Sequence, residues 1–269
     1  MNLAKVLFVI GAVICLPLYG FLSVTALDPV TGFLASENVL TTVFYAALLI
    51  APVLILLSAL FLHKKPAFSI TNSKILAILS AVLGVVMMLN GFVVLWQLIA
   101  SVRATLASEY IFQLPAGALL SALHILTAVL GGLVFLRLAI SYFQENIANR
   151  ESKTFLFPLA WSLICCVELF RDYPQIAGMP ERMLFLLCLL AFTLFLTGQS
   201  RILGDVDFEK GIRWVNGFGL CAALFGLTMT VGEIAAHSSM TLPIFDAVLA
   251  FVLALYCLFF SVNVYTDKD

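Results

Sequence analysis

The sequence predicts an all-α protein, a polytopic bundle of eight transmembrane helices that forms a single domain with no soluble part. Of its 269 residues, 63% are hydrophobic and 11% are charged, whereas soluble domains contain about 25% charged and 45–50% apolar residues. The apolar residues are collected into eight long runs. These runs are continuous rather than alternating, which favours helices over the strands of a membrane barrel.

Each run is interpreted as one membrane-spanning helix, because about 20 mostly apolar residues cross a hydrocarbon core of ~30 Å. The expected spans are 5–26, 40–62, 74–100, 115–142, 155–170, 183–197, 212–235 and 243–264. The fifth is short because charged residues follow it closely. Together the spans leave only short connections within residues 1–269, so any function belongs to the bundle or to its rims.

Lysine and arginine in the connections predict the orientation, since cytoplasmic loops carry an excess of these residues. With the N-terminus inside, eleven of the 14 basic residues fall on the inner side: Lys5, Lys64, Lys65, Lys74, Arg137, Arg150, Lys153, Arg201, Lys210, Arg213 and Lys268. The outer side keeps Arg103, Arg171 and Arg182. We therefore expect an N-in, C-in protein in a cell membrane. The sequence has no N-x-[ST] sequon, which is consistent with a bacterial inner or plasma membrane.

Residues 1–26 also fit a second interpretation. Lys5, an apolar stretch and Ala26 before Leu27 resemble a cleavable signal peptide. Cleavage would leave seven spans and an outside N-terminus. The apolar stretch is long for a signal peptide, which favours the eight-span interpretation.

Small residues predict which helices pack most closely, because helices in lipid associate through close backbone contact. The seventh span carries two small-xxx-small pairs, Gly219 with Ala223 and Ala222 with Gly226. We expect it to be central. In the third span, Gly84 and Gly91 lie seven residues apart and therefore on one face.

Several function classes lack support in the sequence. The net charge of −1 leaves no basic face for nucleic acid, and no GxxxxGK[ST] phosphate loop occurs. The six cysteines lie in apolar runs without a CxxC, so we expect packing roles and no metal or other cofactor. Neither HExxH, GxSxG nor paired metal-spaced histidines occur, so a membrane-embedded enzyme has the least support.

Polar residues within apolar runs are the candidate ligand-binding residues, because polar groups in a membrane are costly. They are Asn90, Gln97, His124, Glu168, Arg171, Glu233 and Asp246. Each has a structural alternative. Glu168 and Arg171 can form an intrahelical ion pair. Asn90 and Gln97 can bond neighbouring helices. His124 can be a buried donor rather than a proton relay, and Glu233 and Asp246 can be solvated span ends.

These candidates lie in the outer half of the expected bundle, whereas the inner half has almost no polar group away from its interface. This asymmetry predicts a polar vestibule that opens outward. The leading hypothesis is a transporter or permease-like protein with a small-molecule ligand in the vestibule. The alternative is a non-transporting membrane subunit, assembly factor or sensor. It would contact a membrane-protein partner or a second copy through the small-residue face of the seventh span.

Overall fold

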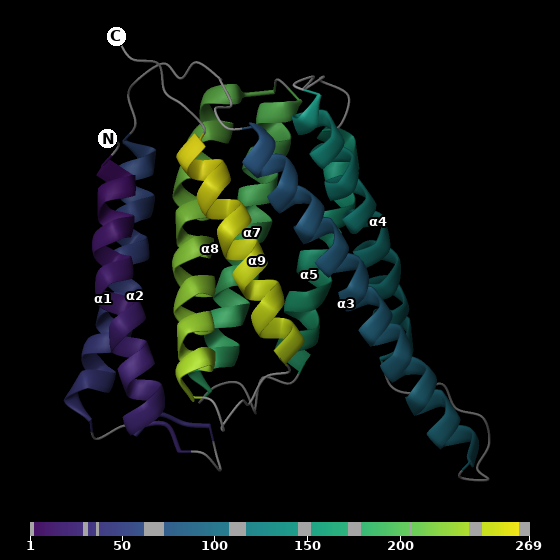
Figure 1. Cartoon of the computed structure of the whole chain (residues 1–269), viewed down its shortest axis with the longest axis horizontal. Helices are drawn as coiled ribbons and strands as arrows, with labels where there is room; N and C mark the ends of the chain where they lie inside the picture. Colours follow the sequence, from purple (N-terminus) through teal and green to yellow (C-terminus); the bar gives the residue numbers. More distant parts are fainter. Residues whose placement is uncertain are drawn as a thin grey trace.

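The computed structural model is a bundle of helices (Figure 1). It describes residues 3–28, 32–35, 38–61, 73–107, 117–144, 152–171, 179–204, 206–236 and 244–263. Within these residues, eight helices are long and apolar enough to cross a membrane. The predicted all-α fold is therefore confirmed, and the chain is a multipass membrane protein.

The helices follow the apolar runs of the sequence. They are α1 (Leu3–Thr25), α2 (Val39–Leu60), α3 (Ser73–Ala107), α4 (Ala118–Phe143), α5 (Leu156–Arg171), α7 (Pro180–Leu203), α8 (Phe208–Ala236) and α9 (Ile244–Asn263), with a short 3-10 turn, η1 (Ser152–Phe155), before α5.

Two helices extend furthest beyond their predicted spans. We expected the third span to end at residue 100, but α3 continues to Ala107. We expected the sixth to cover 183–197, but α7 runs from Pro180 to Leu203. Proline is favoured in the first turn of a helix because its missing N–H has no helical partner to lose. In both cases hydropathy marks the part of a helix that suits lipid, and the helical hydrogen bonds continue into more polar sequence.

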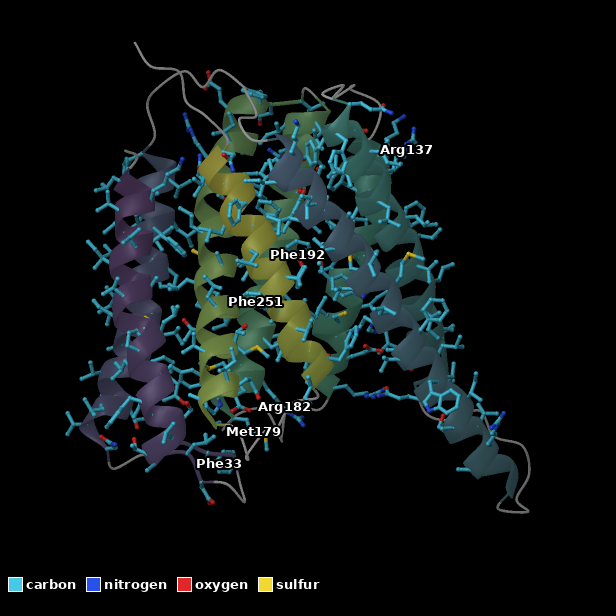
Figure 2. The ribbon with its side chains drawn as sticks, viewed as in Figure 1. Phe33, Arg137, Met179, Arg182, Phe192 and Phe251 are labelled. Atoms are coloured by element: carbon cyan, nitrogen blue, oxygen red, sulfur yellow. The ribbon has the colours of Figure 1, made fainter. Side chains whose placement is uncertain are left out.

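The first and last helices meet at one end of the bundle. Lys5 Nζ near the start of α1 donates a hydrogen bond to the Val262 carbonyl near the end of α9, at 2.9 Å. We call this end the terminal end and the other the opposite end. In Figure 2, Arg137 lies towards the terminal end and Arg182 at the opposite end.

The basic residues separate between these ends as the predicted spans require. At the terminal end are Lys5, Lys74, Arg137, Lys153, Arg201, Lys210 and Arg213, and at the opposite end are Arg103, Arg171 and Arg182. The remaining basic residues, Lys64, Lys65, Arg150 and Lys268, lie outside the described residues. The side of the membrane on which the terminal end lies stays a prediction.

Helix α8 is central, as its small residues predicted. It packs against α1, α2, α7 and α9. A Cβ at Gly226 would lie 2.8 Å from the Ala250 carbonyl oxygen of α9, and one at Gly217 would lie 3.1 Å from a Leu56 methyl of α2. These contacts place the small residues against the chain's own helices.

The outward faces of the helices are apolar. Val13, Leu49 and Trp96 are 67%, 68% and 72% exposed. A soluble protein rarely exposes large contiguous apolar surface, so these faces suit contact with the lipid bilayer. Trp161 contrasts with them, since it is fully buried inside the bundle.

Candidate functional site

The most connected polar group in the bundle is centred on His124 of α4. Its Nδ1 lies 2.5 Å from Oε2 of Glu168 on α5, and its Nε2 lies 2.6 Å from Oδ1 of Asn90 on α3. Asn90 and His124 are buried, and the Glu168 side chain is 24% exposed. Three of the predicted candidates therefore come together across three helices.

Two further residues of α5 complete this group. Trp161 Nε1 lies 3.3 Å from both Asn90 Oδ1 and His124 Nε2, and Cys165 Sγ lies 3.8 Å from His124 Nε2. Trp161, Cys165 and Glu168 follow one another at i, i+4 and i+7, which places them on one helix face. We call Asn90, His124, Trp161, Cys165 and Glu168 the His124 cluster.

Close backbone packing brings the three helices of the cluster together. A Cβ at Gly91, next to Asn90, would lie 3.1 Å from the Ala128 Cβ of α4. A Cβ at Gly131 of α4 would lie 3.1 Å from the Pro158 Cα of α5. Larger side chains at these glycines would separate the helices, so the glycines fix the spacing at which the polar side chains can meet.

The contacts of His124 assign a polar partner to each ring nitrogen. Nε2 faces the Asn90 oxygen, which only accepts hydrogen bonds. The indole N–H of Trp161, a donor only, lies equally close to that oxygen and to Nε2. Nδ1 faces the Glu168 oxygen, and one proton lies between these two atoms, because a bare ring nitrogen and a carboxylate both accept. The imidazole is thus held on both sides by polar side chains from two other helices.

Charged residues from two more helices approach the cluster. Asp246 at the start of α9 interacts electrostatically with His124, with Glu168 and with Arg182 at the start of α7. Asp246 and Arg182 are each partly exposed. The cluster is therefore buried on its Asn90 side, and its charged neighbours lie towards the opposite end of the bundle.

Two predicted candidates lie apart from the cluster. Gln97 is exposed on α3. Arg171 is exposed at the end of α5, and its guanidinium lies against Gly117, which precedes α4. The partner that the structure gives to Glu168 is His124, and the predicted ion pair of Glu168 with Arg171 stays a prediction.

Glu233 belongs to a second polar group. It is 1% exposed on α8 and interacts with Glu181 of α7, which is fully buried. Tyr19 of α1, also fully buried, interacts electrostatically with both. The alternative interpretation of Glu233 as a solvated span end is therefore wrong.

A third polar group lies towards the terminal end, where we expected almost none. Gln199 Nε2 of α7 donates to the Tyr256 hydroxyl of α9 at 2.5 Å, and Tyr142 of α4 is a further partner of Tyr256. Asn216 of α8 is 1% exposed. The predicted asymmetry is therefore weaker than expected. Tyrosines were counted as apolar, and Gln199 fell outside the predicted sixth span.

Several residues of these polar groups were not predicted from the sequence. Arg182 and Glu181 fell outside the predicted 183–197 span and were assigned to a connection. Trp161 was not among the predicted candidates. A helical-face analysis of α5 would have grouped Trp161 and Cys165 with Glu168.

The described residues contain no group of three or more His, Cys, Asp or Glu side chains placed to hold a metal ion. The six cysteines are buried and unpaired with one another. Cys165 alone among them contacts the ring of a described histidine.

No protein-family model matches the chain, and neither a curated protein nor a solved structure matches it. Functional inference therefore depends on the geometry of the polar groups.

Proposed function

We propose that this protein is a transporter or permease-like membrane protein that binds a small polar solute at the His124 cluster. The observation that carries the proposal is the position of His124, which contacts both Asn90 and Glu168 between three packed helices. Placing polar and ionisable side chains inside a membrane protein costs free energy, and such residues commonly mark solute or proton pathways.

The chemistry of the cluster fits a polar, hydrogen-bonding solute. It offers a carboxylate, an imidazole and an amide, with the carboxylate of Asp246 and the guanidinium of Arg182 close by. The two carboxyl groups, of Glu168 and Asp246, are matched by two basic groups, of His124 and Arg182. The site therefore suits a zwitterion or a neutral polar molecule better than a strongly charged ion. The partly exposed Glu168, Asp246 and Arg182 form the rim of the proposed vestibule, and His124 forms its floor.

We also propose that the vestibule opens to the outside of a bacterial plasma membrane. The described basic residues are concentrated at the terminal end, which the positive-inside rule assigns to the cytoplasm. The vestibule lies towards the opposite end, where α7 and α9 begin.

The alternative of a non-transporting subunit depended on a small-residue face available to a partner. In the structure, Gly219 and Gly226 of that face lie against α7 and α9 of the same chain, which leaves this alternative without its main argument. Native mass spectrometry of the purified protein distinguishes the two functions, since a stable stoichiometric partner would favour the subunit.

The test is uptake of radiolabelled solutes into liposomes that contain the full chain. The probes are amino acids, small carboxylates, amines and sugars, each applied alone. We expect at least one zwitterionic or neutral probe to be taken up above the level of empty liposomes, and His124→Ala and Glu168→Gln to abolish this uptake. Gln97→Ala, an exposed polar position on α3, is the matched control. Uptake that both cluster variants retain, or no uptake of any probe, would contradict the proposal.

A further inference from the structure

A second buried site lies at the junction of α1, α7 and α8. Glu181 of α7 and Glu233 of α8 are 0% and 1% exposed, and they interact directly. The ring of Tyr19 on α1 is fully buried, stacks on Phe44 with centroids 4.9 Å apart, and packs against Gly232. Its hydroxyl is thereby held close to the two carboxyl groups. We call Tyr19, Glu181 and Glu233 the acid-pair site.

The acid-pair site has oxygens that no described residue satisfies. Both carboxyl oxygens of Glu233 and the hydroxyl oxygen of Tyr19 are buried without a hydrogen-bond partner among the described residues. A buried polar group without a partner destabilises the folded protein, and a charged one does so more strongly. The contact of Glu233 with Glu181 cannot by itself remove this cost, because ionised carboxylates only accept hydrogen bonds. Two adjacent buried carboxylates do not both stay ionised without a positive charge close to them.

The two helix ends make the carboxyl groups unequal. Glu181 lies in the first turn of α7, where the helix dipole stabilises a negative charge. Glu233 lies in the last turn of α8, where the dipole opposes one. The dipoles therefore make Glu233 the member of the pair that more readily takes up a proton or faces a cation. Arg182, the next residue after Glu181, interacts with Asp246, which lies beside the His124 cluster.

We propose that the acid-pair site binds one exchangeable monovalent cation, either a proton or Na+, between Glu233 and Glu181 with the Tyr19 oxygen as a further ligand. Oxygen-only donor sets select hard cations over the softer transition metals. Calcium needs about 6–8 oxygen ligands, more than these three side chains offer. The proposal involves no residue of the His124 cluster, and it stands or falls independently of the proposed transport function.

The test uses the purified full chain in detergent in weakly buffered solution with a pH-sensitive dye. NaCl is added, with choline chloride as the salt control. If Na+ replaces the shared proton, we expect NaCl alone to release protons, and Glu233→Gln to abolish the release. Tyr19→Phe keeps the stacked ring and removes one ligand oxygen, so it should weaken Na+ binding by roughly 2- to 10-fold. Glu209→Gln, an exposed position at the start of α8, is the matched control.

A second measurement identifies a site that holds only a proton. Infrared difference spectra of wild type and Glu233→Gln would then show a carboxylic-acid C=O band at neutral pH that the variant lacks, without proton release by NaCl. A chain that shows neither proton release nor this band contains no such site, and the proposal would be overturned. Elution of each variant as wild type in size-exclusion chromatography verifies that it is folded.

Discussion

Gly84 of α3 and Gly132 of α4 bring two helix backbones so close together that a Cβ at position 84 would lie 2.7 Å from the Gly132 carbonyl oxygen. The same interface holds Asn90 against His124. The geometry of the His124 cluster therefore depends on residues that carry no polar side chain.

Gly84→Ala should destabilise the protein, because the added methyl group meets backbone that cannot rotate away. We expect a loss of about 1–3 kcal/mol, as for other overpacked positions. Thermal unfolding in detergent measures it. Gly20→Ala is the control, since the atom nearest its Cβ is a side-chain methyl of Val231 at 3.1 Å, which can move. Equal loss in both variants would contradict the proposed role of the α3–α4 contact.

His124 and Glu168 should be energetically coupled. The single variants His124→Ala and Glu168→Gln each remove one side of the 2.5 Å contact. A double-mutant cycle on unfolding free energies should therefore give an interaction of about 0.5–3 kcal/mol, as for residues in direct contact. Additive losses would show that the contact does not contribute to stability.

The buried and exposed tryptophans should differ in their contact with lipid. Trp161 is 0% exposed and Trp96 is 72% exposed. Brominated acyl chains quench the fluorescence of tryptophans that they touch, so Trp96→Phe should remove a large part of the quenchable emission. Trp161→Phe should leave the quenchable part almost unchanged. The reverse order would place Trp161 at the lipid surface and contradict the structure.

Tyr256→Phe should test the polar group near the terminal end. The substitution leaves the buried Gln199 amide without the hydroxyl that it donates to. We expect a loss of about 1–3 kcal/mol in unfolding free energy, the usual cost of an unsatisfied buried donor. Tyr45→Phe on α2, where the side chain is half-buried, is the matched control and should cost less.

The orientation can be measured without first removing the native cysteines, because all six are buried. Two separate variants, Arg213→Cys and Arg103→Cys, each add one thiol, the first at the terminal end and the second at the opposite end of the bundle. In intact cells, a membrane-impermeant maleimide should label Arg103→Cys and leave Arg213→Cys unlabelled until the cells are opened. The opposite pattern would reverse the proposed orientation and turn the vestibule towards the cytoplasm.

The helices could be predicted because each corresponds to a continuous apolar run in the sequence, such as 48–57. The central position of α8 could also be predicted, because Gly219, Ala223 and Gly226 are small residues that let neighbouring helix backbones pack closely against it. Helix ends were predicted less well. Pro180 and Glu181 form the first turn of α7, but a hydropathy run excludes them because they are proline and a charged residue.

The polar contacts could be predicted only in part, because a sequence shows which polar residues are present but not which of them meet. His124 and Glu168 are 44 residues apart, and nothing in their spacing pairs them. Glu233 was identified but not its neighbour Glu181. Tyr19 was missed altogether, since a tyrosine in an apolar helix has no local feature that distinguishes a buried hydroxyl from one at the membrane surface.

Among the described residues, α1 and α2 make their extensive contacts with each other and with α8. The first two helices form a hairpin whose main attachment to the other six runs along α8, with the hydrogen bond from Lys5 to Val262 as a further contact with α9. A displacement of this hairpin would leave the contacts among α3, α4 and α5 intact, but it would have to separate Tyr19 from Gly232 and so open the acid-pair site. The two polar sites therefore lie in parts of the molecule that can loosen one at a time.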